Sequence, residues 1–575
     1  REQLGMEIDL GEGDNVLDLG TTNVATNQTT ITAGSGNDVI TVKGGESALY
    51  NYSVINAGEG DNVVYLSGQW SLHNNSGVIT GSGNDTIVLD GGAIGMSAGQ
   101  VSFVDAGDGD NSVSVTGKDG RYGLSYASVT TGSGDDEIRV QTQGRAGMSN
   151  SAFIDAGDGK NTVFVTGSNG MELYATVRTG DGDDAITING SGGTGVVSNA
   201  KVDAGNGDNT ITVSGSARGL AEYAGLLAGD GNDIIHVTGG SSYGMENNAS
   251  IDAGGGHNMV SVSGAAGMQS ESSITTGGGN DAINVTGTSS WGMNRSSIDA
   301  GDGDNTVTVT GKAQGMGNGT ITSGDGNDTI SVTGNGGYAV GNSTIDAGHG
   351  DNVIRISGTT AGLTGSTVLT GSGDDMVTIT GTGGTAMTGS SRIETGKGDD
   401  TVVVNGAIRD SLVDLGLGND VMRLDGTGQQ VYGSAKLDGG DNDAFDAATG
   451  QLGDVLSLGH DLASALSGSG SLGGITATNT VNFETLHLDL EDGNAGTLDI
   501  DQLLASLDAK GFKGANGFNA VVVTGDQGDA ASYSGEWTAA GRNVMLDGFD
   551  GVSFDRYTVM NGTEVIEIYL QSGMV

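Results

Sequence analysis

The residues of this chain that could do chemistry are carboxylates and amides that recur inside glycine turns. The pattern Gly-x-Gly-x-[Asn/Asp] occurs 18 times. Its first glycines are Gly11, Gly34, Gly58, Gly81, Gly107, Gly132, Gly157, Gly180, Gly205, Gly229, Gly254, Gly277, Gly301, Gly324, Gly348, Gly371, Gly396 and Gly416. Asp carboxylates and loop carbonyls are oxygen ligands of the kind that calcium takes, so a metal-binding turn is the first chemistry that this pattern indicates.

The last position of the pattern alternates between Asp and Asn from the first turn to residue 375. Turns that end in Asn mostly carry an early Asp two residues before the first glycine, whereas turns that end in a late Asp mostly have Thr or Ser nearby. We therefore expect a pair of turns to form the binding unit, one giving an early and one a late carboxylate, with carbonyls completing a shell of about six to eight oxygens. The expected metal ligands are Asp38, Asp85, Asp105, Asp136, Asp155, Asp184, Asp203, Asp233, Asp252, Asp281, Asp299, Asp328, Asp346, Asp375, Asp400 and Asp420.

The charge of the chain favours dissolved cations as partners. Against 71 acidic residues there are 22 Lys and Arg, a formal net charge of -49, so nucleic acid and anionic membranes are repelled. Carboxylates stacked about 4.8 Å apart repel one another by about 1 kcal/mol per neighbouring pair even in bulk water. Gly, Asn and Asp also favour turns on conformational grounds alone. That alternative leaves the repulsion uncompensated, so we expect Ca²⁺ ions, on the order of ten of them, to cancel it.

The period of the repeat predicts the elements that position these turns. Successive first glycines lie about 24 residues apart, a spacing typical of stacked units that bury their apolar faces against their neighbours. Residues 306–310 alternate as in a strand, with Val307 and Val309 on one face and threonines on the other. The chain contains 110 Gly and no Pro, which suits a backbone whose N–H groups are nearly all needed in ladders.

A second column of apolar residues recurs once per repeat, directly after a glycine. We expect it to form an interior stack in which Met fills an irregular gap. Its members are Met96, Met148, Met171, Met245, Met268, Met293 and Met316, with Leu124, Leu220 and Leu363 in the same place.

These observations predict an all-β fold, a right-handed parallel β-solenoid with about 24 residues per rung and a small C-terminal α+β cap. The solenoid should occupy residues 1–438 and the cap residues 439–575, where the period stops. Within the cap, NFETLHLDL (482–490), AVVVTG, GRNVMLDGF and EVIEIYL are expected to be strands. Residues 498–512 should form a helix with Ile500, Leu503, Leu504 and Leu507 on one face.

The turns resemble the glycine- and aspartate-rich nonapeptide of RTX proteins, Gly-Gly-x-Gly-x-Asp-x-apolar-x. SGDGNDTIS (323–331) and AGDGDNTVT (300–308) are two examples, and the resemblance covers residues 11–424. Two features depart from the family: one nonapeptide falls in every 24 or so residues instead of two per short coil, and its first Gly is usually Ala, Thr or Ser.

The resemblance implies calcium bound between coils, a chain that stays unfolded where calcium is scarce, and export by type I secretion through an uncleaved C-terminal signal. This would place the protein outside the cell or on the bacterial cell surface. The opening residues lack the regions of a secretory signal peptide, so we expect an export address elsewhere. No run of eighteen apolar residues occurs, and no membrane span is expected.

Catalysis is not expected. The six His are isolated, there is no HExxH motif, and there is no Cys. Glu137 and Arg139 are the nearest approach to a distinctive cluster and resemble an exposed strand pair. An alternative remains that the solenoid is the calcium-binding scaffold of a carbohydrate-active enzyme, since carboxylate-based enzymes use such folds.

The most consistent function is that of a secreted, calcium-dependent structural protein of a surface layer, filament, extracellular matrix or adhesin. Its expected partners are further copies of itself or a cell-surface glycan. A lesser alternative is an ice-binding solenoid, because outward threonine columns recur; Arg139, Phe164, His236 and Arg355 interrupt them, and ordinary β propensity explains the threonines.

Overall fold

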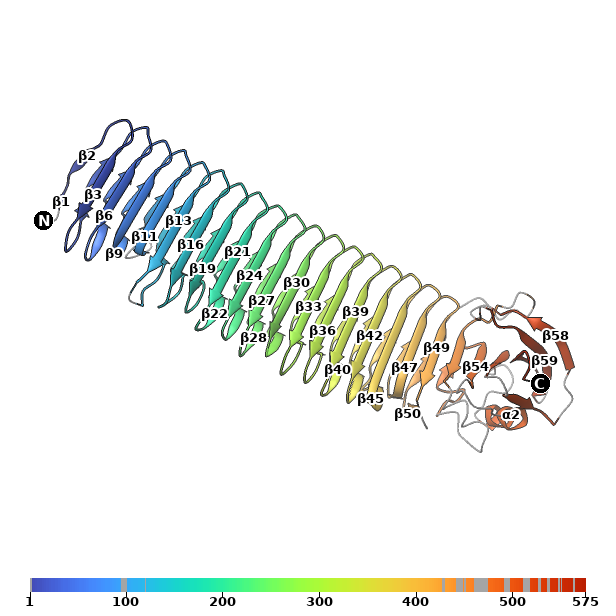
Figure 1. The fold of residues 1–575 in the computed structure, drawn as a ribbon. Helices are drawn as coiled ribbons and strands as arrows, with labels where there is room; N and C mark the ends of the chain where they lie inside the picture. The colour runs from blue at the N-terminus through green and yellow to red at the C-terminus, as the bar shows by residue number, and fades with distance from the viewer. Residues whose placement is uncertain are drawn as a thin grey trace. The chain divides into compact units, whose positions relative to one another are not determined.

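The computed structural model describes residues 3–94, 101–118, 120–426, 430–440, 448, 451–459, 474–490, 497–509, 518–525, 529–534, 538–546, 549, 551–561 and 564–574. The chain divides into two compact units, residues 1–289 with 293–301 and residues 290–292 with 302–575. Each unit is a stack of coils whose strands pair in parallel with the coils before and after (Figure 1). The predicted parallel β-solenoid with about 24 residues per rung is confirmed, and the predicted small C-terminal cap belongs to the second unit.

The longest strands of the first unit show the predicted alternation. In β24 (Thr210–Gly215), Ile211 and Val213 are buried while the threonines and the serine between them point outward, because successive side chains of a strand face opposite ways. β24 pairs with β27 (Ile234–Gly239), and Ile211 lies opposite Ile235. The equivalent strands are β3 (Val16–Gly20), β6 (Val39–Lys43), β9 (Val63–His73), β11 (Thr86–Ile94), β13 (Ser112–Gly117), β16 (Glu137–Thr142), β19 (Thr162–Gly167), β21 (Ala185–Gly190), β30 (Met259–Gly264) and β33 (Ala282–Gly287).

Short second strands carry the predicted Met and Leu column. Met245 lies opposite Leu220 on one side and Met268 on the other, and all three side chains are fully buried. The described members of the column are therefore interior, as predicted, whereas Met96 lies outside the described residues. The strands are β4 (Thr26–Asn27), β7 (Ser47–Tyr50), β14 (Leu124–Ser125), β17 (Met148–Ser149), β22 (Thr194–Val197), β25 (Arg218–Ala221), β28 (Tyr243–Glu246), β31 (Ala266–Gln269) and β34 (Met293–Asn294).

Third strands of three or four residues lead into the glycine turns. Except in β2 (Glu7–Asp9), where Ile8 is half-buried, each buries its central apolar residue, as Val202 does in β23 (Lys201–Asp203). The others in the first unit are β2 (Glu7–Asp9), β5 (Thr30–Thr32), β8 (Val54–Asn56), β10 (Gly77–Ile79), β12 (Ser102–Asp105), β15 (Ala127–Thr130), β18 (Phe153–Asp155), β20 (Thr176–Arg178), β26 (Gly225–Leu227), β29 (Ser250–Asp252), β32 (Ser273–Thr275) and β35 (Ser297–Asp299), and β1 (Gln3–Leu4) precedes them.

The second unit repeats the same three strand layers. Val307 and Val309 are buried in β36 (Thr306–Gly311), as predicted. The long strands continue with β39 (Thr329–Gly334), β42 (Val353–Gly358), β45 (Met376–Thr388), β47 (Thr401–Arg409) and β49 (Val421–Asp425). The second layer is β37 (Met316–Gly317), β40 (Tyr338–Gly341), β43 (Ala361–Thr364) and β50 (Val431–Tyr432). The third is β38 (Thr320–Thr322), β41 (Thr344–Asp346), β44 (Thr367–Leu369), β46 (Arg392–Glu394), β48 (Leu412–Asp414), β51 (Lys436–Asp438) and β53 (Thr480–Val481).

The turn glycines are required by both conformation and crowding. Gly205 and Gly207 have φ of 75° and 124°, which favour a residue without Cβ. A Cβ on Gly207 would lie 2.1 Å from the carbonyl oxygen of Gly182 in the preceding turn. Successive turns can stack this closely only because both positions are glycine.

The cap extends the long-strand layer of the second unit. β52 (Val455–Leu458), β54 (Thr485–Asp489) and β56 (Ala520–Thr524) follow β49 in parallel, and β60 (Glu564–Gln571) continues the same sheet before β59 (Phe554–Asn561) and β58 (Thr538–Val544) close it in antiparallel fashion. β55 (Thr497–Asp499) pairs with β57 (Ala530–Ser532). The predicted helix is α2 (Ile500–Ala509), and its four predicted apolar residues are buried.

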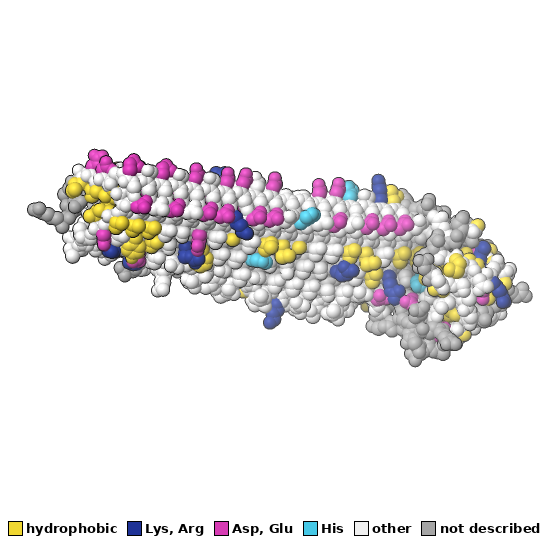
Figure 2. Space-filling model, turned by 45° about the horizontal axis from the view of Figure 1, so that its top comes forward, with side chains coloured by type: hydrophobic (Ala, Val, Ile, Leu, Met, Phe, Trp, Pro, Cys, Tyr) yellow, Lys and Arg dark blue, Asp and Glu magenta, His cyan; other side chains and the backbone are white. Residues whose placement is uncertain are grey.

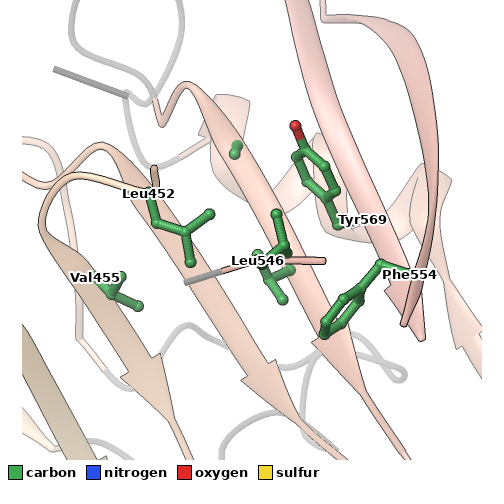
Figure 3. Close-up of a cluster of buried hydrophobic side chains, with 7 residues drawn as sticks. Leu452, Val455, Leu546, Phe554 and Tyr569 are labelled. Carbon is green, nitrogen blue, oxygen red and sulfur yellow. The ribbon is translucent and has the colours of Figure 1, made fainter. Parts of the chain in front are cut away.

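The core of the cap consists of apolar side chains from these strands and from residues close to their ends. Leu452, Val455, Leu546, Phe554 and Tyr569 pack together there (Figure 3). In the described parts of the chain, no helix has the length and apolarity needed to cross a bilayer.

Candidate cation-binding turns

The last residue of each glycine turn points inward and forms a ladder of side-chain hydrogen bonds from turn to turn. The backbone N–H of Asn62 donates to Oδ1 of Asp85 at 2.7 Å, and the N–H of Asp85 donates to Oδ1 of Asn111 at 3.0 Å. These side chains are almost completely buried. We call this the inner ladder. In the first unit it comprises Asn15, Asp38, Asn62, Asp85, Asn111, Asp136, Asn161, Asp184, Asn209, Asp233, Asn258 and Asp281.

In the Asn turns, the second polar atom of the side chain binds its own turn. Nδ2 of Asn62 donates to the carbonyl oxygens of Gly58 at 3.2 Å and Gly60 at 2.8 Å. Nδ2 of Asn209 likewise donates to the carbonyls of Gly205 and Gly207. An Asn turn thus satisfies its inward-facing carbonyls with its own amide.

In the Asp turns, the corresponding atom is an oxygen. Because Oδ1 makes the same ladder bond in Asp and Asn, the second polar atom of the Asp side chain is an acceptor, Oδ2, in place of the donor Nδ2 of Asn. The hydroxyl of Thr131, in the turn of Asp136, donates to the carbonyl of Ala156 at 2.7 Å instead. Buried Oδ2 atoms without a hydrogen-bond partner in the described structure occur in Asp38, Asp85, Asp136, Asp184, Asp233, Asp328, Asp375, Asp400 and Asp420.

The pKa values of these carboxyls reflect their surroundings. Burial raises the pKa of Asp136, Asp184 and Asp233 to about 6 in each case. The pKa values of Asp85 and Asp328 are also raised, again because burial disfavours the charged form. Burial therefore disfavours the ionised form of these five carboxyls.

The second unit differs because its inner ladder loses the alternation. It begins Asn305, Asp328, Asn352, Asp375 and then continues with acidic residues alone, Asp400, Asp420, Asp454 and Glu484. Burial, and then the neighbouring carboxylates, raise the pKa of Asp400 to about 7 and that of Asp420 to about 8. A cavity of about 320 Å³ lined by Asp399, Asp400, Asn419 and Gln451, among others, gives access to this acidic run.

The early Asp residues lie on the other side of the chain. Oδ1 of Asp155 accepts the backbone N–H of Gly157 at 3.4 Å, and Asp203 does the same for Gly205 at 3.3 Å. Their side chains, and those of Asp105, Asp252, Asp299 and Asp346, are half-buried or exposed. The structure thus places the late carboxylates inside the turns and the early ones outside, and it does not bring them into the two-turn shell that the sequence suggested. No group of three or more acidic or His side chains suited to a metal occurs among the described residues, so oxygens beyond the carboxylates would have to come from the turn carbonyls.

Sequence reasoning missed a second ladder, formed by the residue just before the inner ladder. Oδ1 of Asp208 accepts the N–H of Asn232 at 2.7 Å, and Asn232 Oδ1 accepts the N–H of His257 at 2.8 Å. These side chains are exposed, and acidic side chains form rows along the turns within each unit (Figure 2). The sequence did contain a signal for this ladder. Asp or Asn recurs in most repeats at the residue just before the last position of the glycine pattern.

Other residues singled out from the sequence have structural surroundings. Arg139 Nη2 lies 3.0 Å from Oε1 of Glu137 in an exposed ion pair. His487 is buried between Ser457 and Thr524, and burial lowers its pKa to about 4. The outward column is interrupted as expected, since Arg139 lies opposite Phe164. His460 lies outside the described residues.

Comparison with protein-family models, with curated proteins and with solved structures finds no match. The function must therefore be argued from the residues of this chain.

Proposed function

We propose that this chain is a calcium-stabilised structural protein of the bacterial exterior, a surface layer, filament, matrix component or adhesin. The observation that carries the proposal is the set of late Asp residues in the glycine turns whose buried Oδ2 has no hydrogen-bond partner in the described structure. Calcium binds carboxylate and carbonyl oxygens, and these are the atoms that the Asp turns present.

The alternation of Asp and Asn suits this role. Asp184 and the carbonyls of its glycine turn would hold an ion, whereas Asn161 and Asn209 on either side supply their own amide hydrogens and need none. Two carboxylates of the inner ladder are thus separated by a neutral turn, which lengthens their distance to about 9.6 Å and weakens their repulsion. One ion per late Asp gives a number on the order of ten, as the sequence indicated.

Bound calcium would couple folding to the surroundings. Affinity for a metal that binds only the folded chain is folding free energy, so the protein would be ordered at millimolar calcium and loosened where calcium is scarce. This fits a chain that is exported before it folds, acts outside the cell, and associates there with copies of itself or with a glycan. A catalytic role is not part of the proposal.

The alternative explanation for the buried Oδ2 atoms is that the Asp carboxyls are protonated and bind no calcium. A protonated Asp could donate to the turn carbonyl exactly where Asn does, and burial favours that form. The two explanations make opposite predictions for the stability of the fold at neutral and alkaline pH. There the carboxyls are ionised, and only a bound cation can stabilise the inner ladder.

The test is a calcium titration of the whole chain at pH 8, followed by calorimetry and by circular dichroism with and without EDTA. We expect several ions to bind and the β signal to weaken when calcium is removed. The variant Asp136→Asn, Asp184→Asn, Asp233→Asn should bind three fewer ions and depend less on calcium, since Asn satisfies the carbonyls by itself. The matched variant Asp105→Asn, Asp155→Asn, Asp203→Asn changes the outer carboxylates and should bind as the wild type does. A calcium stoichiometry of zero would refute the proposal.

A further inference from the structure

The first unit contains a large groove that the calcium proposal does not use. Its volume is about 730 Å³, and Thr116, Gln141, Thr142, Gln143 and Thr166 line it together with Ser191, Lys118 and two glycines. This size lies within the range of about 300 to 1,000 Å³ typical of ligand sites.

The groove arises from unequal connections between the long strands and the Met column. Gly167 and Met171 are four positions apart, whereas the equivalent pairs Thr142 and Met148, and Gly190 and Val196, are six apart. The short connection leaves a notch between two longer neighbours.

The floor of the groove is a row of outward side chains at matching positions. Thr116 lies opposite Gln141, and Gln141 lies opposite Thr166, on β13, β16 and β19. Nε2 of Gln141 lies 3.5 Å from Oγ1 of Thr116. With β21, which precedes Ser191, the site spans three steps of about 4.8 Å, or about 14 Å, which suits a chain of several rings more than a single small molecule.

One wall is tied in place. The backbone N–H of Arg121 donates to the carbonyl of Lys118 at 3.0 Å, and the hydroxyl of Thr142 donates to the carbonyl of Arg121 at 2.7 Å. The same connection carries two aromatic pairings, with Arg121 lying 4.2 Å from the ring of Trp70 and Arg145 binding the hydroxyl of Tyr122 at 3.0 Å. These pairings hold the connection that contributes Lys118 and Gly120 to the lining.

The chemistry of the lining selects the ligand. None of the described side chains that line the groove is acidic. Gln, Thr and Ser side chains both donate and accept hydrogen bonds, which matches a ligand rich in hydroxyl groups. Lys118 is the charged residue of the lining, and it pairs with Asp90 at 2.8 Å.

From these observations we infer that the groove over β13, β16 and β19 binds a segment of a polysaccharide through the hydroxyls of successive sugar rings. The inference deepens the adhesin role within the proposed function by naming the site and the class of partner. It depends on the folded first unit but not on calcium as a ligand.

The experiment uses the full chain in calcium and two hexasaccharides as probes, cellohexaose for neutral sugars and hexagalacturonate for acidic ones, with isothermal titration calorimetry as the readout. Binding of cellohexaose is expected, and hexagalacturonate should bind more weakly, because the formal net charge of -49 repels an acidic polymer. Gln141→Ala should weaken binding at least about tenfold, which corresponds to about 1.4 kcal/mol. Thr166→Trp places a bulky side chain on the floor of the groove and should prevent the saccharide from binding. Thr238→Ala changes an outward threonine on β27 that does not line the groove, and it should bind as the wild type does.

Two outcomes would overturn the inference. The first is that neither hexasaccharide binds the folded protein, as judged by circular dichroism in the same samples. The second is that binding survives both Gln141→Ala and Thr166→Trp. If the saccharide binds but calcium does not, the proposed calcium role is refuted, whereas the inference that the groove binds a polysaccharide stands.

Discussion

The backbone N–H of Asp400 donates to Oδ1 of Asp420 at 2.8 Å, which stacks two buried carboxyls on consecutive turns of the second unit. Asp375 and Asp454 continue the stack on either side, and no Asn separates these four acids. Glu484 follows Asp454, whereas the earlier acids of the inner ladder alternate with Asn. The acidic run is therefore the part of the molecule in which protons and cations should compete most strongly.

With calcium removed, the free energy of unfolding should fall as pH rises from about 4 to about 8. An unfolded Asp has a pKa of about 3.9, whereas the pKa values of folded Asp400 and Asp420 are raised to about 7 and about 8. The folded chain then holds protons that the unfolded chain has lost, so the stabilisation is complete below about pH 4 and is lost as pH rises through the folded pKa values. Each carboxyl contributes a slope of up to about 1.4 kcal/mol per pH unit. Urea unfolding at several pH values measures it.

The matched variants for this pH dependence are Asp400→Asn with Asp420→Asn, which should flatten the profile, and Asp351→Asn, an exposed Asp that should leave it unchanged. With saturating calcium the slope should approach zero, because metal binding releases the protons of the folded chain and the unfolded chain holds almost none above about pH 5. A wild-type profile that is flat without calcium would contradict the prediction.

Replacing an Asn of the inner ladder by Asp should create a dependence on calcium. In Asn209→Asp, the donors to the carbonyls of Gly205, Gly207 and Ala228 are lost and a carboxylate oxygen faces them instead. At pH 8 without calcium we expect a loss of about 2 to 4 kcal/mol, measured by chemical unfolding. Asn284→Asp, at an exposed position of β33 where Oδ1 accepts the hydroxyl of Thr286, should change stability by less than about 0.5 kcal/mol. Equal effects of the two substitutions would show that the inward amide does not matter.

The repeating elements could be predicted from the sequence because each is a local pattern with a fixed period. The alternation around Val307 and Val309 predicted a strand with one buried face, and the recurrence of Met245 and its equivalents predicted a buried column. Both follow from how side chains alternate along a strand, whatever the exact path of the turns.

The geometry of the turns could not be predicted in the same way. Asp203 and Asp184 looked like complementary ligands because one occupies the early position of its repeat and the other the late position of the adjacent repeat. Between the early and the late position the chain passes through two glycines with positive φ, as at Gly205 and Gly207, which reverse the direction of the backbone. A periodic pattern does not say whether a carboxylate next to such a turn points inward or outward. In the structure Asp184 is buried inside the turn, whereas Asp203 is half-buried on the outside.

The turn glycines should tolerate substitution only where the neighbouring turn leaves room. Gly207→Ala combines a φ of 124° with a Cβ 2.1 Å from the carbonyl oxygen of Gly182, and we expect a loss of about 3 kcal/mol or more. Gly278→Ala is the matched control, since its φ is not positive and no atom lies within 4 Å of the added Cβ. Thermal unfolding of both variants in calcium measures the difference. A fully stable Gly207→Ala would mean that successive turns are not packed as closely as the structure has them.

The Met column should carry a measurable share of the stability of the first unit. Met245 is fully buried between Leu220 and Met268, so Met245→Ala leaves a cavity that the paired strands above and below cannot fill. Large-to-small changes of this kind cost about 2 to 5 kcal/mol. Met259→Ala removes a side chain of the same type that is 50% exposed, and it should cost less than about 1 kcal/mol. Both substitutions remove the same atoms, so a difference between their free energies of unfolding reports the effect of burial alone. Equal free energies would mean that the Met column does not belong to the core.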